Sequence, residues 1–287
     1  DLDFQREGAG SEALANGCTY TGSFSLGKRS GQGAYVCTSG YRLEGMFRDD
    51  KADGTARETL PGGQVYVGQF VAGVREGQGK MTYADGSSYE GQFKAGLREG
   101  VGAMTYADGS KYSGAWKADR RNGDGTFTPA DGSWSYTGGW IDDLREGRGR
   151  LAFVDGSYTY EGGFNKDQPD GDGMVSFGDG RVFEGRFAEG RQSGAGVLTF
   201  ADGRRIVGTF RDYRPHGKAV DAGPNGTFDG EWTDGVLNGP AVVIGRDGTR
   251  FEGSYVAGRR EGLGVEIRAD GSRQQCRWSA GERKQPC

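Results

Sequence analysis

The sequence predicts an all-β fold: an elongated single-layer antiparallel sheet of about twelve stacked β-hairpins. Three observations lead to this fold class. A unit of 22 to 24 residues recurs along the 287-residue chain, aromatic and glycine residues alternate at period 2 within each unit, and Asp-Gly or Asn-Gly pairs recur between units. Period-2 alternation is the spacing of a strand, and these dipeptides favour tight hairpin turns. The chain therefore reads as a series of hairpins.

Residues 89–109 (YEGQFKAGLREGVGAMTYADG) show the pattern of one unit. An aromatic, a glycine and an aromatic share one face of the first predicted strand: Tyr89, Gly91 and Phe93. A six-residue loop, KAGLRE, is expected next. The return strand again has period 2, with Gly100, Gly102, Met104 and Tyr106, and the unit closes on Asp108-Gly109. One unit is therefore one hairpin, and a tight turn leads to the next.

The first aromatic of each unit, called the anchor, defines the repeat. The anchors are Tyr20, Leu43, Tyr66, Tyr89, Tyr112, Tyr136, Tyr160, Phe183, Ile206, Phe228, Phe251 and, degenerately, Gln274. The two 24-residue spacings place an extra residue after Asp131-Gly132 and after Asp155-Gly156, where we expect β-bulges. We predict a single domain over 1–287, with a partial unit at 1–19, eleven repeats at 20–273 and a degenerate C-terminal unit at 274–287.

The partial unit at 1–19 has its own expectation. Counting back one repeat from Tyr20 puts Gly8 and Gly10 at the return-strand glycines, so the first strand of that hairpin is missing or replaced.

This pattern resembles the MORN (membrane occupation and recognition nexus) repeat, in which an aromatic-x-Gly-x-Phe/Trp segment is followed by G-x-G about seven residues later. The resemblance extends over essentially the whole chain and rests on eleven units in register. It implies a sheet of stacked hairpins that serves as a binding scaffold and not as a catalyst. The 57 glycines fit this reading, because they fall at fixed positions of the repeat.

Four cysteines allow the hairpin register to be examined. Cys18 and Cys37 lie at offsets from the anchor that add up to 15, and so do Cys276 and Cys287. Residues that face each other in an antiparallel pair have a constant index sum, so the register favours two disulfides, Cys18–Cys37 and Cys276–Cys287. Such bridges would hold the first full hairpin and the last, and they indicate an oxidising compartment, periplasmic or secreted. The alternative is four free thiols in a cytosolic protein.

The same index sum predicts the faces of each hairpin. Tyr89 should face Met104, Gly91 should face Gly102, and Phe93 should face Gly100. One side of the sheet would then carry the rings and a stripe of paired glycines, where the sheet can bend or another backbone can approach. The other side would carry mostly small or polar side chains.

The rings on one face admit two interpretations. They can pack on each other as a core, or stay partly exposed as an interaction surface. Units five to seven have additional aromatic residues, because Trp134 and Tyr158 occupy matching places in the two longer spacings. The candidate binding residues are Tyr112, Trp116, Trp134, Tyr136, Trp140, Tyr158 and Tyr160.

The predicted six-residue loops repeat an Arg-Glu pair, which we interpret as a solvated rim, with a partner-positioning role as the alternative. The pairs are Arg75-Glu76, Arg98-Glu99, Arg145-Glu146 and Arg260-Glu261. Two units depart from the pattern, one with Leu43 and Ala56 and one with Ile206 and Ala219. There we expect a distorted hairpin or a change in curvature.

Composition excludes several classes of function. A net charge of −4 without a basic cluster disfavours nucleic acid and anionic lipid, and the absence of a long apolar run predicts no transmembrane segment. The one histidine, His216, lies in an irregular loop without a companion motif, so we expect no enzyme, no metal site and no cofactor.

The sequence therefore predicts a non-catalytic scaffold that binds a partner protein or an extended peptide along the aromatic and glycine face. The alternatives are a binder of cell-envelope lipid or glycan and, less favoured, an enzyme.

Overall fold

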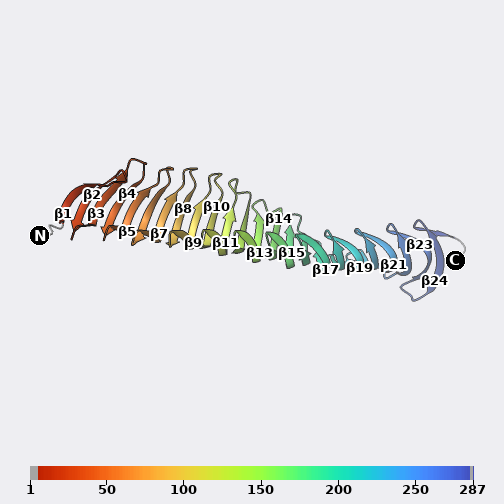
Figure 1. Ribbon diagram of the computed structural model, residues 1–287. Helices are drawn as coiled ribbons and strands as arrows, with labels where there is room; N and C mark the ends of the chain where they lie inside the picture. Colours follow the sequence, from red (N-terminus) through yellow and green to blue (C-terminus); the bar gives the residue numbers. More distant parts are fainter. Residues whose placement is uncertain (1–5, 285–286) are drawn as a thin grey trace. The chain divides into compact units, whose positions relative to one another are not determined.

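The computed structural model describes residues 6–284 and Cys287, which form 25 β-strands and no helix. The strands divide between two compact units, residues 1–144 and 145–287, which are treated separately below. Figure 1 shows the strands in chain order, from β1 in red to β24 in blue.

The first unit consists of short strands, most of them seven to ten residues long. They are β1 (Gly8–Ala13), β2 (Cys18–Ser25), β3 (Lys28–Cys37), β4 (Arg42–Arg48), β5 (Lys51–Thr59), β6 (Val65–Val71), β7 (Val74–Thr82), β8 (Ser88–Lys94), β9 (Leu97–Thr105), β10 (Lys111–Lys117), β11 (Arg120–Thr128) and β12 (Trp134–Ile141).

In the second unit, as in the first, shorter strands of seven or eight residues alternate with longer ones of nine or ten, except for the first and last strands of the chain. Its strands are β13 (Leu144–Phe153), which begins at the boundary, β14 (Tyr158–Asn165), β15 (Gln168–Phe177), β16 (Val182–Ala188), β17 (Arg191–Thr199), β18 (Arg205–Arg211), β19 (Arg214–Gly223), β20 (Gly226–Thr233), β21 (Val236–Gly245), β22 (Arg250–Val256), β23 (Arg259–Ile267), β24 (Arg273–Ser279) and β25 (Glu282–Lys284).

Within each unit every strand pairs antiparallel with the next strand of the chain. The first unit pairs in this way from β1 to β12, as in β8 with β9 and β9 with β10, and the second from β13 to β25. Among the described residues, no helix or second sheet covers the strands. This open, single-layer sheet of hairpins confirms the predicted fold class.

The register is confirmed over one half of each hairpin and differs over the other. Tyr89 faces Met104 and Gly91 faces Gly102, as predicted, but Phe93 faces Arg98 instead of Gly100, because the register shifts between Gly91 and Phe93. The same shift recurs in hairpins of both units. The predicted six-residue loop is therefore wrong. A two-residue turn, Ala95-Gly96, connects the strands, with φ angles of 50° and 84°.

The bulges expected after Asp131-Gly132 and after Asp155-Gly156 are not found between the strands on either side of those turns. Pairing between β11 and β12 runs without a shift to Phe127 and Tyr136, and pairing between β13 and β14 runs to Ala152 and Thr159. The extra residue lies in the connection between the strands. A longer connection leaves the ladder hydrogen bonds intact, whereas a bulge would remove one.

The partial N-terminal unit lies where the repeat places it. In β1, Gly8 faces Phe24 and Gly10 faces Gly22, which matches the pairing of Gly77 with Phe93 further along. The hairpins of Leu43 and Ile206 keep the regular pairing and the regular register shift, so their pairing is not distorted.

The core contains anchor side chains together with the aromatic side chains four residues after them. Eight of the anchors are at most 1% exposed: Tyr20, Tyr66, Tyr89, Tyr112, Tyr136, Tyr160, Phe183 and Phe251. Five tyrosine rings lie across the glycine pairs of their own hairpins, namely Tyr20, Tyr66, Tyr89, Tyr112 and Tyr160. A Cβ atom built on Gly102, for example, would come within 2.2 Å of the Tyr89 hydroxyl. The Tyr89 hydroxyl donates a hydrogen bond to the Gln92 carbonyl at 3.0 Å. The predicted glycine stripe is therefore covered by the protein's own rings.

Candidate functional site

The candidate site begins with a continuous ladder of rings. The ring of Trp116 lies 5.3 Å from that of Tyr89 and 5.2 Å from that of Tyr112, with edge-to-face geometry in both cases. Trp140 repeats this with Tyr112 at 5.4 Å and Tyr136 at 5.2 Å. Edge-to-face pairs of this kind stabilise a core beyond simple burial. Each hairpin thus inserts one ring between its own anchor and the preceding one.

The structure separates the seven sequence-predicted binding residues into two groups. Five are core residues no more than 4% exposed: Tyr112, Trp116, Tyr136, Trp140 and Tyr160. Trp134 and Tyr158 are half-buried. Trp134 is the first residue of β12, and Tyr158 is the first residue of β14. The packed interpretation of the aromatic face therefore describes the anchors.

A row of half-buried rings follows the edge of the core in the first unit. The ring of Phe127 lies 5.5 Å from that of Trp134 and 6.5 Å from that of Tyr106. Phe127 faces the anchors Tyr112 and Tyr136, and Tyr106 directly follows the last residue of β9, two residues after Met104, which faces Tyr89. This row, Tyr106, Phe127 and Trp134, is called the rim row below. Unlike the anchors, its rings are partly exposed to solvent.

Sequence reasoning missed the role of the arginine nine residues after the anchor. The guanidinium carbon of Arg98 lies 4.3 Å from the ring centroid of Trp116 and 5.7 Å from that of Tyr89. Arg121 repeats the contact with Trp140 at 4.1 Å. We call such a residue a covering arginine and the space of its head group the guanidinium slot. Only 17% of the Arg98 side chain is exposed, so the predicted solvated rim is wrong for these arginines.

The covering arginines also hold the turn of the next hairpin. Arg98 donates from Nε to Oδ1 of Asp119 at 2.9 Å, and from Nη2 to the Asp119 carbonyl at 2.7 Å. Asp119 has a φ of 68°, which side chains other than glycine adopt at a cost. Equivalent arginine–aspartate pairs occur at Arg29–Asp50, Arg121–Asp143 and Arg145–Asp167.

The glutamates of the Arg-Glu pairs have a defined role as well. Glu76 accepts the backbone N–H of Ala95 at 3.0 Å, and Glu99 accepts that of Ala118 at 3.0 Å. Each Arg-Glu pair therefore lies within a strand and holds the turn of the following hairpin. A signal was present in the sequence, because the pair recurs at a constant distance from the anchor.

The covering arginine is absent from a run of hairpins in the second unit. The position is occupied there by Pro169, Gln192, Pro215 and Leu237. At Gln192 the space is filled by Tyr213 of the next turn, whose ring lies 5.3 Å from that of Phe183 and whose N–H is accepted by the Gln192 amide oxygen at 3.0 Å. At Leu237 a cavity remains, with a volume of about 400 Å³.

Burial determines the acid–base properties of the anchors. Removal from water raises the pKa of four anchor tyrosines to about 12, although nearby arginines oppose the shift in the first unit; these are Tyr66, Tyr89, Tyr112 and Tyr160. The neutral hydroxyl is therefore the form that the fold requires. A tyrosine held neutral in this way is a structural group and not an activated one.

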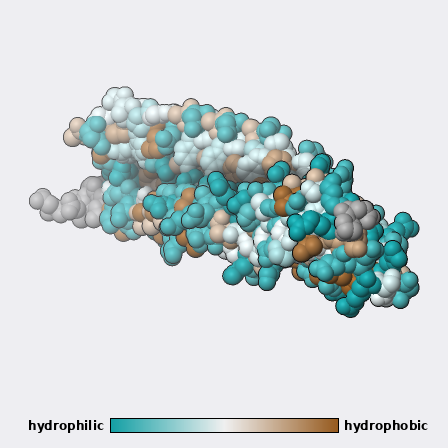
Figure 2. Space-filling view, turned by 90° about the vertical axis from the view of Figure 1, so that its right-hand side faces the viewer, coloured by the Kyte–Doolittle hydropathy of each residue, from teal (hydrophilic) through white to brown (hydrophobic). Residues whose placement is uncertain are grey.

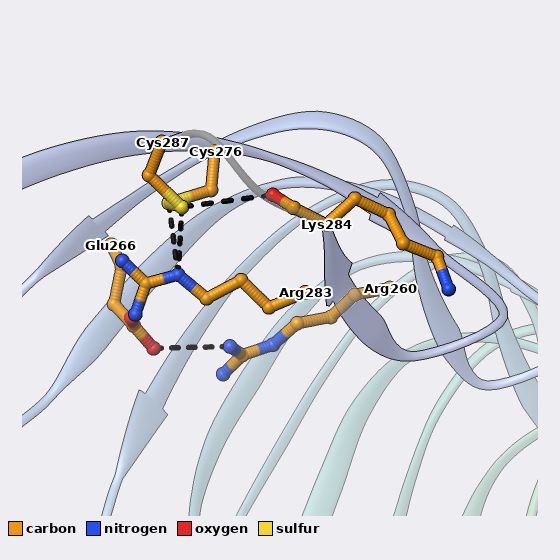
Figure 3. Close-up of a disulfide and its surroundings, with 6 residues drawn as sticks. All are labelled: Arg260, Glu266, Cys276, Arg283, Lys284 and Cys287. Atoms are coloured by element: carbon orange, nitrogen blue, oxygen red, sulfur yellow. Dashed lines mark hydrogen bonds and ion pairs between the residues drawn. A yellow bond between two sulfur atoms is a disulfide. The ribbon is translucent and has the colours of Figure 1, made fainter.

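Both predicted cysteine pairs are disulfide-bonded in the structure. Cys18 and Cys37 face each other across β2 and β3. Cys276 is bonded to Cys287, and Arg283 donates from Nε toward both sulfur atoms, at 3.1 and 2.9 Å (Figure 3). The described pairs of β24 and β25 end at Arg277 and Lys284, so the register at Cys287 lies outside them. Two such bridges are compatible with an oxidising compartment.

The described residues contain few groups that could carry out chemistry. His216 lies beside Asp234, with 3.3 Å between Nδ1 and Oδ1, and is partly exposed. Within residues 6–284 and Cys287, no group of three or more His, Cys, Asp or Glu residues is placed to hold a metal ion. In the same part of the chain, no helix has the length and apolar character needed to span a bilayer.

The surface visible in Figure 2 is mostly hydrophilic, with hydrophobic residues in small separate spots. This agrees with an apolar content of only 34% and with the burial of most of the aromatic anchors.

Comparison with protein families gives a match over most of the chain. The MORN repeat family matches ten segments: residues 20–40, 44–65, 66–88, 89–111, 112–134, 136–158, 160–180, 183–204, 228–250 and 251–273. The unmatched interval 205–227 contains the hairpin of Ile206 and Ala219. No protein with a curated description matches the chain.

Among solved structures, three matches are to one type of domain. The TCP10c domain of Drosophila melanogaster Sas-4 is 17% identical, with 61% of this chain and 97% of that chain covered and a TM-score of 0.24. The SAS-4 TCP domain in complex with a proline-rich motif of Ana2 is 13% identical (78% and 85% covered, TM-score 0.23), and the TCP10 domain of Danio rerio CPAP is 14% identical (85% and 99% covered, TM-score 0.23). Likenesses at these TM-scores support no inference about function.

Proposed function

Because the chain belongs to the MORN repeat family, we propose that it is a non-catalytic scaffold that binds a partner protein, through an extended peptide segment lying along its aromatic face. The repeat scaffold follows from the family and the fold. What we propose in addition is that the partner is a protein and that it binds along the aromatic face.

One observation favours this face: the rings of the rim row are half-buried, and one of them packs on an arginine that is held by hydrogen bonds. Arg121 lies over the rings of Phe127 and Trp140, at 5.8 and 4.1 Å, and its hydrogen bonds to Asp143 hold it in place. Aromatic rings with few rotatable bonds, held by a rigid sheet, lose little conformational entropy on binding. An extended segment crossing several hairpins would meet such a ring in each of them.

The remaining candidate residues have a supporting role in this proposal. Tyr112, Trp116, Tyr136, Trp140 and Tyr160 form the core beneath the face, and Trp134 and Tyr158 are the members that a ligand can contact. The disulfides support a periplasmic or secreted location, where the partner would then be found.

The test selects binders from a displayed library of random peptides against the folded, oxidised chain. We expect selected peptides to bind with saturation and to lose at least tenfold in affinity on Trp134→Ala. The matched control is Val101→Ala, because Val101 is 66% exposed on the opposite face and should leave affinity unchanged. Equal losses for both variants, or saturable binding of lipid vesicles or glycans with no peptide selected, would contradict the proposal.

A further inference from the structure

The cavity at Leu237 lies where other hairpins hold the head group of a covering arginine. In β20–β21 the anchor is Phe228, and Leu237 stands nine residues after it. One hairpin further on, Arg260 is present and lies 4.2 Å from the ring of Phe251 and 4.6 Å from that of Trp278. Figure 3 shows this Arg260, with its ion pair to Glu266. Leucine replaces the apolar stem of an arginine and leaves the guanidinium slot without a head group.

The walls of this slot are aromatic, like those of the slots that hold an arginine. Phe228, Trp232 and Tyr255 line the cavity. Trp232 is 8% exposed, and its indole N–H is donated to the Ala219 carbonyl at 2.9 Å, which fixes the ring. One further change widens the space, because Gly223, which lines the cavity, stands where other units have an aromatic residue of the Tyr106 type.

The hydrogen-bond acceptor of the slot is also retained. In an occupied slot, Arg98 donates to the Asp119 carbonyl, and the turn is positioned by the Asp119 N–H, which donates to the Arg98 carbonyl at 3.1 Å. The same backbone bond joins the Gly258 N–H to the Leu237 carbonyl at 2.9 Å, and Gly258 lines the cavity. The carbonyl of Gly258 therefore stands at the acceptor position.

The charge of the lining favours a cation. Asp202 and Asp221 lie on the cavity with one arginine, Arg204, which leaves one net negative charge. Asp221 is 4% exposed and accepts hydrogen bonds from Nε and Nη2 of Arg204, while Arg204 itself lies 4.6 Å from the ring of Phe200. Arg204 is thus held by its own partners.

We propose that this cavity is a binding site for an arginine side chain of the partner, which would enter the guanidinium slot at Leu237 and stack on Phe228 and Tyr255, the rings that correspond to Phe251 and Trp278 around Arg260. The proposal rests on the proposed function for the source of that arginine. A guanidinium suits the site better than an ammonium, because it is planar, stacks on rings and donates several hydrogen bonds in one plane. The chain's own Arg98, Arg121 and Arg260 fill the equivalent space in this way.

The first experiment uses a small probe, N-acetyl-arginine methylamide, and its neutral isostere, N-acetyl-citrulline methylamide. Titration of the full oxidised chain is followed by the NMR signal of the Trp232 indole N–H. We expect saturable binding of the arginine probe, at least tenfold tighter than that of the citrulline probe. Equal affinity for the two probes, or no saturable shift with either, would overturn the proposal.

The second experiment fills the slot from within. Leu237→Arg should be accommodated as Arg260 is, and should weaken binding of the arginine probe at least tenfold. Leu237→Met is the matched control of similar length without a charge, and should bind within threefold of the unchanged chain. Tyr255→Leu removes one wall and provides a second variant, with an expected loss of about tenfold. Unchanged binding in Leu237→Arg or in Tyr255→Leu would contradict the assignment.

The outcomes separate this inference from the proposed function. Selected peptides that depend on Trp134 but tolerate replacement of every arginine by citrulline would refute the arginine site and leave the scaffold proposal standing. Binding of the arginine probe without any Trp134-dependent peptide would refute the scaffold proposal and support the slot.

Discussion

The first and second units build the same hairpin from different sets of residues. In the first unit the anchors are tyrosines except for Leu43, and covering arginines stand at Arg29, Arg75, Arg98 and Arg121. In the second unit only Tyr160 is a tyrosine anchor, and between Arg145 and Arg260 the covering position holds proline, glutamine, proline and leucine. The backbone register is nevertheless the same.

The comparison indicates that ring, glycine and arginine form a linked set. Alanine replaces the second glycine of the pair only where the anchor is not a tyrosine: Ala56 with Leu43, Ala219 with Ile206, and Ala241 with Phe228. A tyrosine hydroxyl needs the volume that a methyl group would occupy. The second turn residue is other than glycine only where a covering arginine, or Gln192, lies one hairpin before it, although glycine is kept after Arg75 and Arg260.

Alkaline pH should separate the two units most strongly. Tyr66, Tyr89 and Tyr112 have folded-state pKa values raised to about 12, against about 10 in an unfolded chain. A raised pKa means that the stabilisation is complete below pH 10 and is lost as the pH rises through 12. Each tyrosine should contribute on the order of 2 kcal/mol to this loss.

The measurement compares urea midpoints at about pH 9 and about pH 11 in two single-tryptophan chains, one keeping Trp116 and the other keeping Trp278. The midpoint reported by Trp116 should fall further. Equal losses at both reporters would contradict the tyrosine-based account of the first unit.

Gly102→Ala should strongly destabilise the first unit, because its Cβ would overlap the Tyr89 hydroxyl. We expect a loss of about 3 kcal/mol in the free energy of unfolding, measured by urea denaturation. Combining it with Tyr89→Leu imitates the Leu43 and Ala56 hairpin and should cost less than the two single changes added together. Strict additivity would show that ring and glycine are not linked.

A smaller effect is expected at the turn held by Arg98. In the unchanged chain, Asp119→Gly removes the acceptor of Arg98 and should cost about 1 kcal/mol. After Arg98→Leu, the same Asp119→Gly should be stabilising by about 0.5 to 1 kcal/mol, because glycine adopts a φ of 68° without strain. The check is a double-mutant cycle on urea midpoints, and the idea fails if Asp119→Gly has the same sign in both backgrounds.

Much of the fold follows from the sequence because period 2 and Asp-Gly turns are local signals. The pairing of Tyr89 with Met104 and of Cys18 with Cys37 follows from them directly. The two-residue turn at Ala95-Gly96 was missed, because alanine is not a usual residue at a positive φ. The expected loop then hid the shift that brings Arg98 opposite Phe93.

The site was predictable in composition but not in arrangement. The sequence singled out the aromatic residues of units five to seven, and the rim row includes Trp134 among them. It could not show that Trp116 and Trp140 are covered, because a ring and a guanidinium from different hairpins meet only after the hairpins stack. The slot at Leu237 becomes visible only when its neighbours are seen to be filled.

The central claim is that each tyrosine anchor lies on the glycine pair of its own hairpin. NMR of a glycine-labelled chain tests this directly, because a ring in contact with a glycine moves its Hα signals strongly upfield. The account predicts such shifts, with contacts to the ring of Tyr89, for Gly91 and Gly102, and their absence for Gly208 in the Ile206 hairpin. Ordinary glycine shifts at Gly91 and Gly102 would contradict it.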